Sequence, residues 1–120
     1  MNDINFFHPA QVWQYNTRSG EESSKLTVLK IDELENDTII HIRIDSINIG
    51  SGNYIGHMPF SAAAIEASVS GFVKHLNELP EFEEGYQQWK KEFDEGKAGY
   101  WKITVREAID AVSKMLTDAE

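Results

Sequence analysis

Hydrophobic and polar residues alternate most clearly in residues 38–49, and this pattern predicts the central strand of a sheet. Isoleucines occupy positions 39, 40, 42, 44, 47 and 49, and β-branched side chains favour strands. Successive strand residues point to opposite faces, so His41, Arg43 and Asp45 share the face that the even-numbered isoleucines leave free. The apolar phase changes by one residue after Asp45, which indicates a bulge or a sharp twist near Ser46.

Shorter segments around this stretch predict further strands. Residues 11–17 and 25–31 are rich in aliphatic and aromatic residues and flank the sequence RSGEES. Gly20 in that sequence favours a turn, so we expect these two segments to form an antiparallel hairpin. Residues 54–57 follow the turn-forming sequence GSGN and predict a short fourth strand.

After Pro59 the apolar residues recur at helical spacing. One apolar stripe predicts a helix over 62–77, with Ser61 as its N-cap. An aromatic stripe predicts a second helix over 83–95 that ends at Gly96. A third helix is expected over 105–116, because the preceding sequence TVRE matches a capping box. Between the last two helices, residues 98–103 predict one more strand.

Strands that precede helices along a chain are typical of the α+β class. We therefore predict a mostly antiparallel sheet of four or five strands, in the order β-β-β-(β)-α-α-β-α. Three helices are expected to pack mainly on one of its faces. A length of 120 residues, without an internal repeat or a linker-like segment, favours a single domain over residues 1–120.

The charge balance changes which partners are expected. Eleven basic residues against 20 acidic ones give a net charge of −9. This disfavours nucleic acids and anionic membranes, which bind cationic surfaces, and it favours a basic protein partner. The chain has no cysteine and shows neither a signal peptide nor a long apolar span. We expect a cytoplasmic protein of bacterial type.

The polar face of the central strand is the first candidate site. His41, Arg43 and Asp45 could together bind an anion or a carboxylate of a partner, because arginine presents a planar fork of donors. They could equally form the solvated face of a sheet whose other face packs on helices. His57, close to Tyr54 and just before the first predicted helix, lies where binding residues often occur, or it fixes that junction by bonding to the backbone.

The aromatic stripe of the second predicted helix is another candidate. Tyr86 and Trp89 are interleaved with glutamates and aspartates, so they could anchor a basic partner at an acidic rim. Their helical spacing favours the alternative, in which both side chains face the core.

Motifs for common chemistries are missing from the sequence. It contains no HExxH pair, no GxSxG and no phosphate-binding glycine loop, and its four histidines stand far apart. We therefore predict no catalytic residue, no metal ligand and no cofactor.

The stretches HMPFS, EGYQQWK and GYWKITVREAI resemble a family of small uncharacterised bacterial domains, and this resemblance implies no function. From size, charge and expected compartment we predict a non-catalytic protein-interaction module, comparable to immunity proteins and antitoxin-like inhibitors. The alternative is a small-ligand-binding domain or an enzyme with a pocket near His41, Arg43 and His57. A third hypothesis is a homo-oligomer that forms through an edge or the open face of the sheet.

Overall fold

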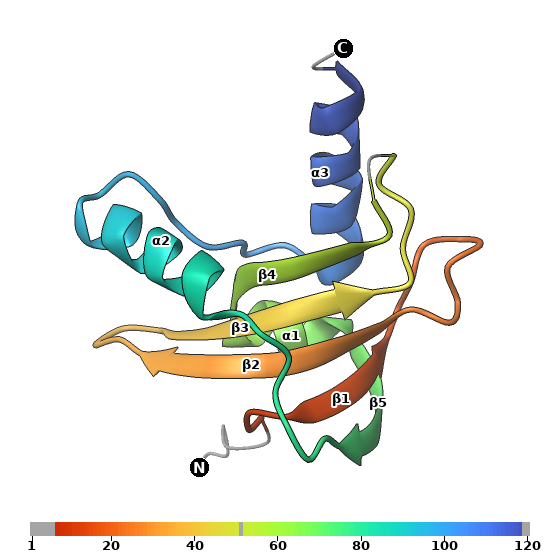
Figure 1. Cartoon of the computed structure of the whole chain (residues 1–120), viewed down its shortest axis with the longest axis horizontal. Coiled ribbons are helices and arrows are strands. Elements are labelled where there is room, and N and C mark those ends of the chain that lie inside the picture. Colours follow the sequence, from red (N-terminus) through yellow and green to blue (C-terminus); the bar gives the residue numbers. More distant parts are fainter. Residues whose placement is uncertain (1–6, 51, 119–120) are drawn as a thin grey trace.

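A computed structural model describes the backbone of residues 7–50 and 52–118 and confirms the α+β class (Figure 1). Five antiparallel strands form one sheet in the order β4-β3-β2-β1-β5. The strands are β1 (Gln11–Tyr15), β2 (Lys25–Glu33), β3 (Thr38–Asp45), β4 (Tyr54–Ser61) and β5 (Val69–His75). The helices are α1 (Ala62–Ser68), α2 (Glu83–Asp94) and α3 (Val105–Asp118).

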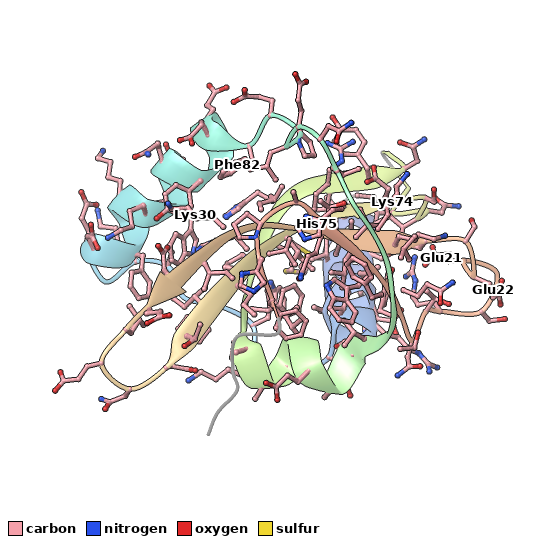
Figure 2. The ribbon with its side chains drawn as sticks, turned by 90° about the horizontal axis from the view of Figure 1, so that it is seen from below. Glu21, Glu22, Lys30, Lys74, His75 and Phe82 are labelled. Carbon is pink, nitrogen blue, oxygen red and sulfur yellow. The ribbon has the colours of Figure 1, made fainter. Side chains whose placement is uncertain are left out.

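The two faces of the sheet are covered by different helices. The main hydrophobic core joins the even-numbered isoleucines of β3 to Ile65 of α1 and Ile109 of α3. A smaller cluster joins Ile39, on the opposite face, to Tyr86 and Trp89 of α2. Figure 2 shows α1 and α2 on opposite sides of the sheet. Two of the three helices therefore share one face, and α2 alone packs on the other.

Several local predictions are confirmed at the level of single hydrogen bonds. Ser61 caps α1 by accepting the amide of Ala64 at 3.1 Å. The Thr104 amide donates to the Glu107 carboxylate at 3.0 Å, and the Glu107 amide donates to the Thr104 hydroxyl at 3.2 Å, which is the reciprocal pattern of a capping box. The phase change after β3 coincides with Ser46, whose φ of 62° is left-handed.

The helix predicted over 62–77 is wrong in its second half. The helix α1 ends at Ser68, and the chain continues as β5, which pairs with the outer edge of β1. Valine, serine and glycine in the sequence SVSGFV are weak helix formers. Pairing supplies their backbone groups with partners, and Phe72 packs against Trp13 with ring centroids 5.4 Å apart. The apolar residues that predicted one helix therefore belong to a helix and to the strand that follows it.

The strand predicted over 98–103 is also wrong. Residues 98–103 contain one isolated parallel bridge, between Trp101 and Phe60 of β4. Trp101 donates its amide to the Pro59 carbonyl and accepts the Ser61 amide, both at 2.9 Å. Because β4 leads directly into α1 at this point, there is little free strand edge along which the pairing could continue.

Helix lengths also bear on membrane insertion. Within residues 7–50 and 52–118, no helix is long and apolar enough to cross a membrane.

Ser68 links the end of α1 to the start of α3 and offers a test of this packing. Its buried hydroxyl donates to the Ala64 carbonyl at 2.7 Å and accepts the Val105 amide at 2.9 Å. We expect Ser68→Ala to lower the free energy of unfolding by about 1–3 kcal/mol, because the buried Val105 amide loses its partner. Ser70→Ala, at an exposed position of β5, should change it by less than about 0.5 kcal/mol. Equal effects in urea unfolding would contradict this role of Ser68.

Candidate functional site

A chain of hydrogen-bonded polar side chains lies between the sheet and α2. The ring of His41 on β3 is fully buried, and both of its nitrogens are engaged. Its Nε2 lies 3.0 Å from Oδ2 of Asp32 on β2, and its Nδ1 lies 2.9 Å from Nε2 of His57 on β4. Tyr86 of α2 donates its hydroxyl to the same Asp32 oxygen at 2.8 Å. Four residues from four elements therefore form one network.

A β-bulge in β2 brings Asp32 to this network. The register of β2 against β3 shifts between Val28 and Lys30, so Leu29 is an extra residue and Lys30 lies opposite His41. Without the extra residue, Leu29 would stand opposite His41. The shift places Asp32 on the same face as His41, one diagonal step along the strand pair, where a carboxylate can reach the ring.

A second bulge, in β4, positions His57. The register of β4 shifts between the partners of Ile42 and Ile44, which leaves both Gly56 and His57 opposite Arg43. The ring of His57 stacks on that of His41, with centroids 5.0 Å apart and planes 15° apart. Bulges re-aim side chains in this way, and here two of them flank one histidine.

Helix α2 covers the network on the side that faces away from the sheet. The rings of Tyr86 and Trp89 meet His41 edge-on, with centroids at 4.9 and 4.8 Å. Both aromatic side chains are buried, which confirms the prediction that their spacing faces the core. The indole of Trp89 donates to the Gly99 carbonyl at 2.8 Å and so ties the segment after α2 to the same site. Neither ring offers a surface to a partner.

The contacts of Asp32 fix which nitrogens carry protons. A carboxylate only accepts hydrogen bonds, so Nε2 of His41 must be the protonated nitrogen. In the neutral ring Nδ1 of His41 is then an acceptor, and His57 donates its Nε2–H to it. Nδ1 of His57 consequently carries a lone pair, and it has no hydrogen-bond partner among the described residues. The partly exposed carboxylate of Asp32 thus determines the tautomer of His57, which is two hydrogen bonds away.

Burial keeps both histidines neutral at neutral pH. Desolvation lowers the pKa of His41, and the bond to Asp32 opposes this only in part. Desolvation, together with the neighbouring His41, lowers the pKa of His57 to about 4. The pKa of the Tyr86 hydroxyl is raised by burial and by its bond to Asp32, so it remains a donor.

His57 borders a surface pocket of about 240 Å³ at the start of α2. The pocket is lined by Gly56, His57, Glu81, Phe82, Glu84 and Gly85. Glu81 accepts the Glu83 amide at 3.1 Å, so the positive end of the helix dipole is already met by a carboxylate. The network therefore ends at a small, acidic opening.

The remaining predicted site residues form a second group nearby. Nε of Arg43 donates to both carboxylate oxygens of Asp45, at 3.0 and 3.1 Å, and the guanidinium lies 4.3 Å from the ring centre of Tyr54. Tyr54 is 50% exposed, whereas His41 on the same strand face is 0% exposed. The interpretation of this face as solvated is thus wrong at His41, which α2 covers, and holds best at Tyr54.

Sequence reasoning missed Asp32 and the pocket carboxylates as site residues. The strand predicted over residues 25–31 ends before Asp32, whereas β2 extends to Glu33 and its extra residue disturbs the alternation. The one signal for Asp32 is the polar alternation of Lys30 and Asp32 around Ile31. Glu81 and Glu84 are among the acidic residues around the aromatic stripe of the second predicted helix, and the sequence does not single them out from the others.

The three stretches HMPFS, EGYQQWK and GYWKITVREAI meet at this site, although they are separated in the sequence. Gly85 lies against the His57 side chain, Trp89 bonds to Gly99, and Trp101 bridges to Phe60. Compared with protein-family models, with curated proteins and with solved structures, the chain gives no significant match. Within the described part of the chain, no group of three or more histidine, aspartate or glutamate residues could hold a metal ion.

The low pKa of His57 makes stability depend on pH. Between the ordinary value of 6.5 and about 4, the unfolded chain binds a proton that folded His57 does not. Stability is therefore full above pH 6.5 and falls as the pH is lowered toward 4. After allowance for partial exposure, we expect the loss to be about 1–2 kcal/mol. Thermal or urea unfolding between these pH values measures it.

His57→Gln is the matched variant, because its amide can still donate to His41 but cannot titrate. The difference in stability between the two proteins should shrink as the pH falls. His75→Gln, on the exposed edge strand, should keep the wild-type profile. Parallel profiles for the wild type and His57→Gln would show that His57 titrates normally and would contradict its burial as a neutral ring.

Proposed function

We propose that the protein is a non-catalytic interaction module that binds a basic protein, with a lysine or arginine side chain of that partner in the pocket beside His57. The observation that carries this proposal is the chemistry of the pocket. The polar side chains that line it among the described residues are His57, Glu81 and Glu84, and because Nε2 of His57 is bonded to His41, the polar atoms that remain on them are acceptors only. Ammonium and guanidinium groups are the donors that such a set favours.

The neutrality of His57 matters for this preference. A protonated imidazole would repel a cation and would present no lone pair. The pKa of about 4 keeps the ring neutral and accepting at neutral pH. Phe82 adds an apolar wall against which the stem of a long basic side chain can pack.

Pocket size favours one side chain over a whole metabolite. Sites for small molecules usually enclose about 300–1,000 Å³, and this one encloses about 240 Å³ and is open to solvent. The remaining binding energy would therefore come from the surface around it. The net charge of −9 supports attraction of a basic partner over a longer range.

Binding rather than catalysis is favoured by the same residues. The described lining contains no serine, threonine or cysteine that could act as a nucleophile. A base with a pKa of about 4 is weak at neutral pH. Within the class of interaction modules we favour an inhibitor of the immunity or antitoxin type in the cytoplasm, in keeping with the size and the acidity of the chain.

A second function is favoured by one specific observation. In the chain Asp32–His41–His57, a carboxylate orients, through a buried histidine, a second histidine that borders a pocket, and carboxylate-oriented bases are found in many acid–base sites. A small amine ligand could bind there through His57, whereas Arg43 is already paired with Asp45. Stabilisation of the protein by a small amine alone, at concentrations below about 1 mM, would favour this second function.

The pocket carboxylates provide the test of the leading proposal. The double variant Glu81→Gln/Glu84→Gln should weaken binding of the basic partner at least tenfold, because a seated cation loses both of its counter-charges. Affinity capture from the chain's own host, followed by titration calorimetry at low and high salt, measures this loss. Binding should also weaken as salt is raised.

The matched control removes two charges from the other end of α2. Glu92→Gln/Glu95→Gln produces the same net charge but leaves the pocket intact, so binding should weaken less than threefold. Equal losses of affinity in both double variants would show that binding depends on net charge alone. Equal losses, or the lack of any stoichiometric basic partner, would contradict the proposal.

A further inference from the structure

We propose that Asp32 and His41 determine the specificity of the pocket, because they hold Nδ1 of His57 as an acceptor and because one added proton turns that atom into a donor. The inference concerns the regulation of the same pocket, so its biological meaning rests on the proposed function. Its physical content rests on the hydrogen-bond chain alone.

The geometry allows the chain to run in either of two directions. In the neutral state His57 donates from Nε2 to Nδ1 of His41, and His41 donates from Nε2 to Asp32. The separation of 2.9 Å between the histidine nitrogens suits a hydrogen bond of either polarity. Reversal of the first bond therefore requires protons to move but no heavy atom.

One proton added from the pocket reverses that bond. An N–H bond forms at Nδ1 of His57, the N–H bond at its Nε2 breaks, and a new N–H bond forms at Nδ1 of His41. The net change is one proton gained. His57 is neutral again, with its proton now on the pocket side, and His41 carries the positive charge next to Asp32.

The surroundings favour the charge on the inner ring. From β2, the carboxylate of Asp32 lies 3.0 Å from His41, whereas the ammonium of Lys30 opposes the charge. From β3, Arg43 is already paired with Asp45. On the side of α2, the charged groups are Glu81, Glu83, Glu84, Lys90 and Asp94. Tyr86 holds Asp32 from that side without contributing charge.

A second proton cannot be held in the same geometry. Both nitrogens that face each other across 2.9 Å would then carry hydrogens, and two positive rings would be stacked. The chain therefore has one reversible protonation step before the packing of α2 is disturbed. The lowered pKa values of both rings place that step below neutral pH.

The consequence is a change in which groups the pocket accepts. At neutral pH it presents a lone pair to an ammonium or guanidinium group. After one proton is taken up, Nδ1–H of His57 opposes such donors and can instead bond to a carboxylate or carbonyl oxygen. A partner seated through arginine would thus be released on mild acidification, without unfolding of the pocket.

Nitrogen NMR on the full chain with ¹⁵N-labelled histidine tests the inference directly. At pH 7.5 we expect His57 protonated at Nε2 and bare at Nδ1; on lowering the pH, Nδ1 of His57 and Nδ1 of His41 should gain hydrogens in the same step. A neutral His57 protonated at Nδ1 at pH 7.5, or protonation of His57 as a separate cation, would overturn the proposal.

Asp32→Asn is the informative variant, because its amide oxygen can still accept from Nε2 of His41 but cannot stabilise a positive charge there as the carboxylate does. We expect the wild-type tautomers at neutral pH in this variant, and uptake of the first proton at a lower pH than in the wild type. Tyr86→Phe removes the other bond to Asp32 and should leave the wild-type tautomers. If Asp32→Asn does not fold, the ¹⁵N NMR titrations of the wild type and of Tyr86→Phe test the proposal without it. Proton uptake by folded Asp32→Asn at the same pH as in the wild type would overturn the role of Asp32.

Binding of propylguanidinium separates this inference from the proposed function. Its affinity should fall at least tenfold between pH 7.5 and the pH at which the chain has taken up one proton. Affinity that does not change across the step would overturn the switch even if the pocket binds. Predicted tautomers together with no binding at any pH would leave the proton chain intact and contradict the cation pocket.

Discussion

The hydrogen bond between Asp32 and His41 is the interaction on which the rest of the site depends. It is formed between neighbouring strands beneath α2, where the fully buried imidazole of His41 would be costly to leave unpaired. Because it fixes the proton on His41, it also fixes the direction of the bond from His57. The aromatic face of α2 then packs on the His41 ring, whose two nitrogens already have partners. The Asp32–His41 hydrogen bond thus constrains both the packing of α2 and the direction of the hydrogen-bond chain at the site.

This constraint is an unusual use of a sheet interior. A buried apolar residue at position 41 would fill the same space without two buried hydrogen bonds, and such replacements are often neutral or stabilising. Two bulges, in β2 and β4, are needed to align the polar chain. We infer that the polar chain serves to present an accepting nitrogen of His57 at an acidic pocket. Places where a sequence departs from the simplest core are often functional.

Much of the frame could be predicted from the sequence, because it follows from local rules. The isoleucine face of β3, the caps at Ser61 and Thr104, and the span of α2 are set by short-range spacing and capping chemistry. The fifth strand could not be predicted. Residues 69–75 contain weak helix formers, and they form a strand because the free edge of β1 is available for pairing. Asp32 was missed for a similar reason: its position depends on a bulge, and a bulge leaves only a broken alternation in the sequence.

The central claim is that His57 donates a hydrogen bond directly to His41, and that Asp32 fixes this direction. The scalar coupling between the two ¹⁵N nuclei across the bond measures it most directly. At neutral pH we predict a resolvable coupling between Nε2 of His57 and Nδ1 of His41, with the hydrogen on His57. No coupling, or a coupling with the hydrogen on His41, would contradict the account.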